Sequence, residues 1–298
     1  MNGLGAANFR VRVDGRPATV VAVHRVEDGT RVVLMLDESG SMAPVEQGPG
    51  DFAELLARDF LTREWDGNHI AFLSFGTHVY AEADFSTTLG GIANLLAPPA
   101  NPKLPVAHGT TSLWDAMSRA AALFRKIRPG DAIYLITDGG ANSGKESQYN
   151  LSDQMVRKGV RIFVFLVDTH VWLPGRWYPE DERGVGALFG LAKRTGGGEP
   201  VFPFRTREML SVRRPPDYMG KAWDAFWKYR RFSMLRPVLD ALYSRMTDYY
   251  GVELFRSENA ARMAKVKLWI ADPQGARVRH IEVDYPHQIA ACSPARNN

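Results

Sequence analysis

Apolar and polar positions along the chain switch between two periods. Short, nearly continuous apolar runs predict buried strands, and apolar residues that recur every three or four positions predict helices between them. We expect strands at residues 31–36, 69–75, 79–85, 131–137, 160–167 and 200–204. We expect helices at residues 51–65, with Asp51 as the N-cap, and at 113–127, 147–158 and 184–194. Strands that alternate with helices indicate an α/β fold with a doubly wound, mostly parallel sheet, whose ligands bind at the carboxyl ends of the strands where the strand order reverses.

The two ends of the chain show a different pattern, the alternation of apolar and polar residues that is typical of half-buried strands. Residues 9–13 alternate and turn into 20–23, and residues 266–270 alternate and turn into 278–283. We expect hairpins from both termini to build a small β-subdomain beside the main sheet. The predicted organisation is an N-terminal β flank (1–30), an α/β domain (31–255) and a C-terminal β flank (256–298).

The first strand of the predicted sheet runs directly into Asp37, Ser39 and Ser41. In extended backbone this period-two spacing sends all three side chains to one side. A carboxylate with two hydroxyls suits a small hard cation such as Mg²⁺, and the absence of sulfur and imidazole argues against zinc or copper. The alternative is an Asx or Ser turn that ends the strand.

Two later segments add oxygen ligands. A second apolar strand ends at Thr137-Asp138-Gly139, and Thr111 lies in a hydroxyl-rich loop that opens a helix containing Leu113 and Asp115. Asp-x-Ser-x-Ser, Thr-x-Leu-x-Asp-Ala and Thr-Asp-Gly, in this order, closely resemble the von Willebrand factor type A (VWA) domain. The resemblance covers about residues 31–255, and the flanks look like the bacterial branch known as VWFA-related proteins.

The resemblance implies a metal-ion-dependent adhesion site (MIDAS) that holds Mg²⁺, or Mn²⁺ or Ca²⁺, with hydroxyls in direct contact and the aspartates acting partly through water. Its five positions are Asp37, Ser39, Ser41, Thr111 and Asp138. Thr110 stands where the family usually has glycine, and the spacing to Leu113 and Asp115 favours Thr111 as the ligand. The implied function is protein binding rather than catalysis: two aspartates leave a divalent ion electrophilic, so that it accepts an acidic residue of a partner protein.

Loops at the same end of the sheet would set specificity. The segment 168–183 is long and carries Trp, Tyr and Arg, the residue types that dominate binding hot spots. Its candidate partner-binding residues are Trp172, Arg176, Trp177 and Tyr178. The alternative is that these rings pack against the domain.

Positive charge is concentrated in one stretch, residues 205–236, which has nine basic and three acidic residues, while the whole chain carries a net charge of +4. Trp223, Phe226 and Trp227 repeat there at helical spacing. We expect these rings to pack on the core; contact with an anionic membrane surface is the alternative, and nucleic acid is not expected because no nucleic-acid module is present.

Composition describes an ordinary globular protein, with 45% hydrophobic and 23% charged residues. The single cysteine, Cys292, excludes an internal disulfide, and no apolar stretch reaches the ~20 residues that span a bilayer. Residues 1–6 lack the features of a signal peptide, so the sequence as written predicts a cytoplasmic protein. Members of the bacterial branch are often exported, and a truncated N-terminus would instead fit the cell envelope.

An enzyme is the competing class of function. Residues 139–146 nearly match a phosphate-binding loop, but Glu146 occupies the position where that loop needs Ser or Thr. No Gly-x-Ser-x-Gly elbow surrounds Ser39 or Ser41. The sequence therefore predicts a metal-dependent binding module; the alternatives are a scaffold whose metal is not used by the partner, and a Mg²⁺-dependent phosphohydrolase.

Overall fold

In this computed structural model, the strands of the described residues form two five-stranded sheets. The structure describes residues 4–26, 29–42, 49–63, 69–96, 110–128, 130–167, 179–201, 221–255, 263–279, 281 and 283–290, without the side chains of 179–182 and 221–232. No helix among these residues is both long enough and apolar enough to span a membrane.

The central sheet has the order β5-β4-β3-β6-β7. Its strands are β3 (Arg31–Asp37), β4 (His69–Phe75), β5 (Val79–Ala83), β6 (Ala132–Thr137) and β7 (Arg161–Leu166). Strands β4, β3, β6 and β7 are parallel, and β5 pairs antiparallel with β4 at the edge. The chain builds outwards from β3 to β5 and then returns to place β6 on the other side of β3. The order therefore reverses between β3 and β6, as the sequence predicts for the strands that carry Asp37 and Asp138.

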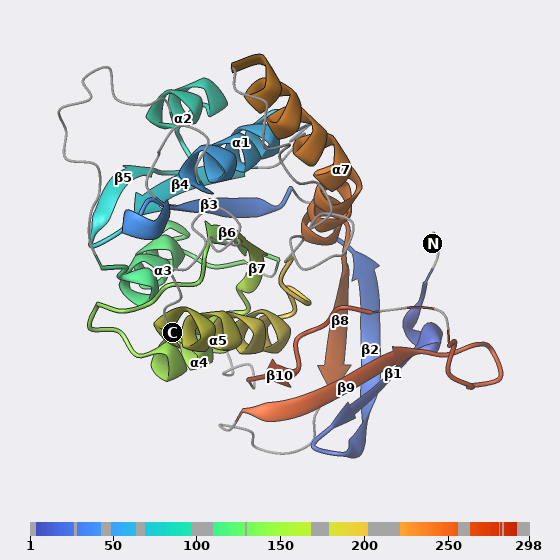
Figure 1. Cartoon of the computed structure of the whole chain (residues 1–298). Helices are drawn as coiled ribbons and strands as arrows, with labels where there is room; N and C mark the ends of the chain where they lie inside the picture. Colours follow the sequence, from blue (N-terminus) through green and yellow to red (C-terminus); the bar gives the residue numbers. More distant parts are fainter. Residues whose placement is uncertain are drawn as a thin grey trace.

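Helices cover both faces of this sheet (Figure 1). They are α1 (Pro49–Leu61), α2 (Leu89–Leu95), α3 (Leu113–Leu123), α4 (Gln148–Lys158), α5 (Pro179–Thr195) and α7 (Lys221–Thr247), with short 3-10 turns η1 (Ala6–Asn8) and η2 (Gly40–Met42). One core cluster joins the sheet to α1, α2 and α7, and a second joins the opposite face to α3, α4 and α5. This confirms the doubly wound α/β class.

Strand β3 shows why the sequence reads as a continuous apolar run. Leu34 and Leu36 belong to the cluster beneath α1 and α7, whereas Val33 and Met35 belong to the cluster beneath α3. A strand that is buried on both faces needs apolar side chains at consecutive positions rather than at alternate ones.

The second sheet is built from both ends of the chain and has the order β10-β9-β1-β2-β8 (Figure 1). Its strands are β1 (Phe9–Val13), β2 (Arg16–Arg25), β8 (Tyr250–Phe255), β9 (Ala264–Ile270) and β10 (Gln288–Ile289). β1 pairs antiparallel with both β2 and β9, which forms the small terminal β-subdomain that the alternating flanks predict. β8 directly follows α7 and pairs with β2, so it belongs to this terminal sheet rather than to the central one.

Several boundaries differ from the sequence prediction. Helix α1 begins at Pro49, so Asp51 lies in its first turn and is not the N-cap. Helix α3 ends at Leu123, four residues early, and strand β5 ends at Ala83. The predicted strand 278–283 is absent from its described residues: next to β9 there is only a bridge from Ala271 to Arg277 and a bond of 3.0 Å from Val278 N to Ile270 O. β10 pairs with the other end of β9, at Ala264 and Lys265. The predicted strand at 200–204 is a single bridge from Val201 to Phe165, and the rest lies outside the described residues.

Candidate metal centre

Asp37 ends β3 with its carboxylate almost fully buried, at 1% exposure. Its Oδ1 accepts a hydrogen bond of 2.9 Å from the backbone N–H of Ser39, and the hydroxyls of Ser39 and Ser41 share a bond of 3.4 Å. The extended backbone expected beyond Asp37 does not form; residues 40–42 make the 3-10 turn η2, with Met42 N bonded to Ser39 O. The turn, rather than strand alternation, brings the two hydroxyls together.

Asp138 follows β6, the parallel neighbour of β3, and is 7% exposed. Its Oδ1 accepts the backbone N–H of Gly140 at 2.9 Å. The preceding residue, Thr137, joins the two strand ends: its hydroxyl donates to Asp37 Oδ2 at 2.5 Å and accepts from Gly139 N at 3.0 Å. The carboxyl ends of β3 and β6 are therefore tied together through buried polar groups.

Two buried carboxylates at adjoining strand ends are electrostatically costly. Burial raises the pKa of Asp37 from 3.8 to about 7, and the negative charge of Asp138 adds to the rise. Hydrogen bonds from Thr137 and Ser39 act in the opposite direction, because they stabilise the charged form. A cation bound between the two carboxylates would oppose both effects that raise the pKa, because it stabilises the charged form.

Thr111 is 3% exposed, whereas its neighbour Thr110 is exposed to solvent. Asn142, in the loop after Asp138, accepts the Thr111 N–H through its side chain at 2.7 Å, and the Thr111 carbonyl accepts the N–H groups of Asn142 and Ser143 at 3.2 Å. The loop that carries Thr111 is therefore fastened to the loop that carries Asp138, at the same end of the sheet. The buried threonine is the one favoured by the sequence.

Ser112 attaches the Thr111 loop to a third strand end. Its N–H donates to Gly76 O at 2.8 Å, and its hydroxyl donates to Thr77 O at 2.9 Å and bonds Ser143 at 2.9 Å. Gly76 and Thr77 directly follow β4. The loops that follow β3, β4 and β6 thus meet the start of α3 at the carboxyl ends of the strands, where the strand order reverses.

Residues 139–146, the near-match to a phosphate-binding loop, use backbone N–H groups to attach this loop to helix α3. Asp115 on α3 accepts the backbone N–H groups of Lys145 at 3.0 Å and Glu146 at 2.6 Å. A phosphate-binding loop uses such N–H groups for phosphate oxygens. Here a carboxylate of the protein already occupies them.

Sequence reasoning missed the residues that hold the ligands in position: Thr137, Asn142, Ser143 and Ser112. For Thr137 a signal existed, because it belongs to the Thr137-Asp138-Gly139 strand end that the sequence marks. In the structure the parallel register pairs Leu36 with Ile136, which sets Asp37 beside Thr137. The other contacts depend on loop conformations that no periodic pattern encodes.

Some predicted site residues are not described by the structure. Trp172, Arg176, Trp177 and Tyr178 lie outside the described residues, and their partner-binding role stays a prediction. Within the described chain, no three His, Cys, Asp or Glu residues cluster as a metal site. The candidate centre instead combines two carboxylates with hydroxyl groups.

The sequence matches no protein-family model and no curated protein. Solved structures with similar folds include an aerotolerance-related membrane protein from Bacteroides fragilis, with 19% identity over 61% of this chain and 94% of that chain and a TM-score of 0.43. The SpRpn10 VWA domain has 12% identity over 55% of this chain and 82% of its own, with a TM-score of 0.39. The manganese-loaded TRAP protein of Plasmodium vivax has 12% identity over 84% of this chain and 96% of that chain, with a TM-score of 0.39.

The arrangement of the chain itself agrees with the resemblance seen in its motifs. Helices cover both faces of a mostly parallel sheet, and Asp37 and Asp138 lie at the adjoining ends of β3 and β6. In fold, the protein is VWA-like.

Proposed function

We propose that this VWA-like protein is a metal-ion-dependent protein-binding module. In this proposal Asp37, Ser39, Ser41, Thr111 and Asp138 hold Mg²⁺, or Mn²⁺ or Ca²⁺, and the ion receives an acidic residue of a partner protein. The observation that carries the proposal is the buried carboxylate pair, in which burial and the charge of Asp138 raise the pKa of Asp37 to about 7.

The chemistry of the donor set fits a hard divalent cation. All five side chains offer oxygen, which Mg²⁺, Mn²⁺ and Ca²⁺ prefer, and none offers sulfur or imidazole nitrogen. The two carboxylates carry a formal charge of −2 when ionised, and the three hydroxyls are neutral. A divalent ion would neutralise the pair and offset both causes of the raised pKa of Asp37, burial first and the charge of Asp138 second.

Other residues of the chain would hold these donors in place. Thr137 and the N–H of Ser39 orient the Asp37 carboxylate, Gly140 N orients Asp138, and Asn142 anchors the Thr111 backbone. Such supporting hydrogen bonds fix ligand orientation before an ion arrives. When bound, the ion supplies an electrophilic coordination position for a carboxylate oxygen of the partner.

Partner capture with and without chelator tests the proposal. We expect proteins captured by the immobilised chain in Mg²⁺ to be released by EDTA, recaptured when Mg²⁺ is restored, and lost with Asp138→Asn. Asp248→Asn is the matched control, because Asp248 is half-exposed and its only ion pair among the described residues is with Arg25. It should capture the same proteins as the wild type.

Two outcomes would contradict this function. Capture that ignores both EDTA and Asp138→Asn would indicate a scaffold whose metal, if bound, does not meet the partner. Hydrolysis of p-nitrophenyl phosphate that needs Mg²⁺ and is lost in Asp138→Asn would indicate a phosphohydrolase.

A further inference from the structure

The terminal sheet presents one face to the body of the protein and another to solvent. On β1, Phe9, Val11 and Val13 are buried, and the alternate residues Arg10 and Arg12 face outwards. On β9, Ala264, Val266 and Ile270 are buried while Lys265 and Lys267 are exposed. The outward side chains of the two neighbouring strands form a patch that we call the basic face: Arg10, Arg12, Lys265, Lys267 and Trp269.

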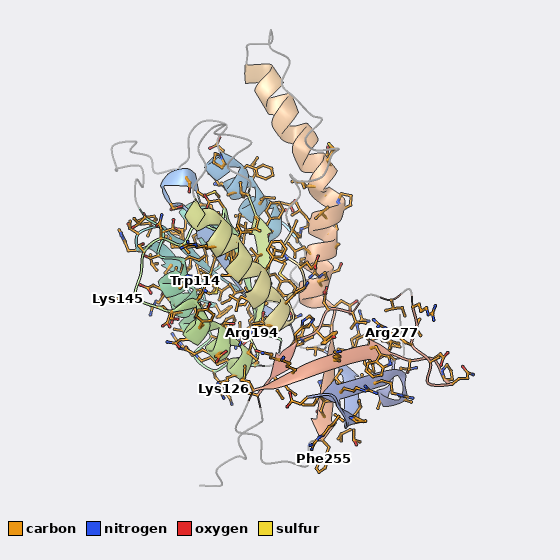
Figure 2. All side chains as sticks on the ribbon, turned by 60° about the horizontal axis from the view of Figure 1, so that its bottom comes forward. Trp114, Lys126, Lys145, Arg194, Phe255 and Arg277 are labelled. Atoms are coloured by element: carbon orange, nitrogen blue, oxygen red, sulfur yellow. The ribbon has the colours of Figure 1, made fainter. Side chains whose placement is uncertain are left out.

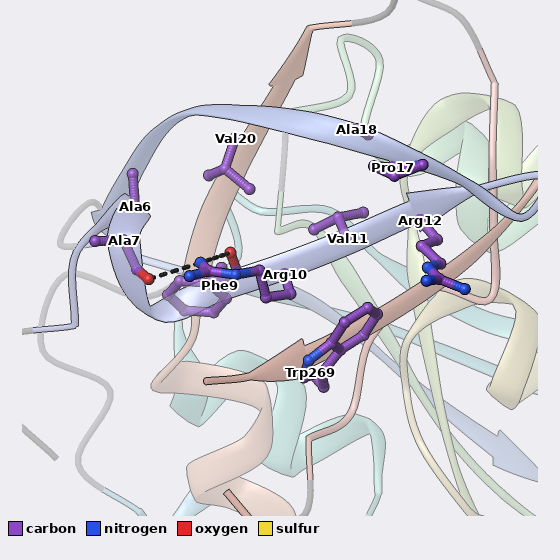
Figure 3. Close-up of a pocket in the computed structure, with 10 residues that line it drawn as sticks. All are labelled: Ala6, Ala7, Phe9, Arg10, Val11, Arg12, Pro17, Ala18, Val20 and Trp269. Carbon is purple, nitrogen blue, oxygen red and sulfur yellow. Dashed lines mark hydrogen bonds between the residues drawn. The ribbon is translucent and has the colours of Figure 1, made fainter. Parts of the chain in front are cut away.

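The cations of the basic face have no ion-pair partner among the described residues. The antiparallel register sets Arg12 directly opposite Lys267, and Arg10 opposite Trp269. Like charges directly opposite each other on a sheet are destabilising. Arg10 donates from Nη1 to the backbone carbonyls of Ala7 and Phe9 at 2.8 and 3.1 Å, and those acceptors carry no charge (Figure 3). Two carboxylates lie beside the four cations: Asp14 accepts the Lys265 N–H at 2.8 Å, and Glu253 is exposed on the same side of β8 as Phe255. The face therefore keeps a net positive charge.

Apolar side chains extend the same face. Thr19 pairs with Phe255 and Arg12 with Pro17, so the alternation along β2 places Phe255 on the side of Arg12. Phe255 is 62% exposed and lies at the lower end of the sheet in Figure 2. The bulge between Val20 and Ala22 leaves Val21 59% exposed. These two side chains add apolar surface beside the cations.

A hollow of about 490 Å³ opens beside these cations (Figure 3). Its lining includes the small apolar residues Ala6, Ala7 and Pro17, together with Arg10, Arg12 and Trp269. The hollow thus places an indole ring and two guanidinium groups beside apolar side chains.

We propose that the basic face docks on the surface of an anionic lipid bilayer. Cations interspersed with Trp, Phe and aliphatic side chains suit the boundary between headgroups and acyl chains, where the charges meet lipid phosphates and the apolar groups enter the hydrocarbon edge. A single-stranded nucleic acid would stack its bases on an aromatic face. The Trp269 ring already carries the Arg12 guanidinium, 6.0 Å from its centroid, and an exposed valine adds nothing to a base stack. The lipid surface is the better match.

Flotation with vesicles tests this docking on the full chain. Vesicles of phosphatidylcholine with 30% phosphatidylglycerol are compared with pure phosphatidylcholine vesicles, in EDTA so that the metal centre plays no part. We expect binding to the anionic vesicles alone, weakened by added salt. The double variant R12Q/K267Q should bind about thirtyfold less tightly, the factor that two cations near an anionic surface contribute together. Phe255→Ser should weaken binding further.

The matched control is K126Q/K158Q, which removes the same charge from exposed positions in the loop after α3 and at the end of α4. It should bind like the wild type, and circular dichroism of each variant reports that the fold is retained. Three results would overturn the docking: equal binding to uncharged vesicles, equal loss in the control variant, or binding to an oligothymidine in a fluorescence anisotropy titration without binding to vesicles. None of them would bear on metal-dependent capture, because EDTA is present throughout.

Discussion

Among single residues, Asp37 is the one whose charged form is most disfavoured by its place in the candidate metal centre. It is buried beside Asp138 and is held by Thr137 and Ser39, so its position is favourable for binding an ion and unfavourable for the metal-free charged state. Binding sites commonly keep such groups at the expense of stability. This gives a pH dependence with a definite sign.

The free energy of unfolding of the metal-free protein should fall as pH rises from about 4 to about 7. The pKa of Asp37 is 3.8 when unperturbed and about 7 in the folded protein. Between these values the folded state keeps a proton that the unfolded state has released, so rising pH favours unfolding. Urea unfolding in EDTA at pH 5 and pH 8 measures this. The wild type should lose roughly 2–4 kcal/mol relative to Asp37→Asn, at about 1.4 kcal/mol for each pKa unit. Parallel pH profiles for the two proteins would contradict it.

Thr137→Val should weaken Mn²⁺ binding about tenfold, the typical effect of losing a group that orients a ligand. The change removes the hydroxyl that donates to Asp37 Oδ2 and nearly preserves side-chain volume at a fully buried position. Titration calorimetry gives the affinity, and Thr137→Ser is the control because it keeps the hydroxyl. Equal Mn²⁺ affinities for Thr137→Val and the wild type would show that Thr137 does not orient Asp37.

At the scale of elements, Arg161 on β7 holds the end of helix α7. Its guanidinium donates to the carbonyls of Arg245 at 3.1 Å, Met246 at 2.7 Å and Gly130 at 2.8 Å, and stacks 3.8 Å from the Tyr249 ring centroid. The last carbonyls of a helix lack partners within the helix. Burial lowers the pKa of Arg161 to about 10, which still leaves it charged at neutral pH.

Arg161→Met should therefore destabilise the protein by about 2–4 kcal/mol, since it removes three hydrogen bonds to carbonyls and leaves Met246 O only the Thr30 hydroxyl at 3.4 Å among the described donors. Arg161→Lys should recover less than half of the loss, because a single ammonium cannot reproduce the planar fork of donors. Arg157→Met, at an exposed position of α4, should change stability by less than about 0.5 kcal/mol. Urea unfolding compares the three. Equal stability of the Met variants would mean that Arg161 does not secure α7.

Helix α5 approaches the Asp138 loop so closely that only glycine fits at the contact. A Cβ on Gly184 would lie 1.8 Å from the carbonyl oxygen of Gly139, directly after Asp138. Gly184→Ala should displace the loop and lower both stability and Mn²⁺ affinity. Gly186→Ala and Gly190→Ala meet nothing within 4 Å and should instead stabilise the helix by about 0.5–1 kcal/mol each. Calorimetry and thermal unfolding of all three measure this, and a harmless Gly184→Ala would refute the contact.

The elements with strong periodic patterns could be predicted from the sequence, and those decided by tertiary contacts could not. β3, β4 and β6 are buried on both faces, and their apolar runs mark them clearly. Helix α2 has seven residues with two adjacent glycines, so its pattern is weak; it forms because Ile92 is fully buried against the core and Thr88 caps it by accepting the Gly91 N–H. Strand β10 has two residues and exists only because β9 has a free edge.

At the scale of the whole molecule, the reversal of strand order brings together residues that are far apart in the sequence. Asp37 and Thr137 are separated by 100 positions and share a hydrogen bond of 2.5 Å. The motifs place Asp37 and Asp138 at strand ends, and the fold sets those strand ends side by side. The motifs did not predict the supporting hydrogen bonds or the turn after Asp37, which arise from loop packing.

The two sheets divide the proposed roles of the molecule. The central sheet carries the candidate metal centre, and the terminal sheet, assembled from both ends of the chain, carries the basic face (Figure 1). Because β8 follows α7 and pairs with β2, the terminal sheet is continuous with the helix whose residues Leu235, Leu239 and Leu242 pack on the central core. Both sheets are thus parts of one folded chain, and the two proposals can be tested on the same protein.

Isothermal titration calorimetry with Mn²⁺ and with Mg²⁺ at pH 8 measures whether the chain holds a divalent ion. We expect uptake of one divalent ion per chain by the wild type and by Asp248→Asn, and no uptake by a variant that carries both Asp37→Asn and Asp138→Asn. Absence of uptake by the wild type, or equal uptake by the double variant, would contradict it.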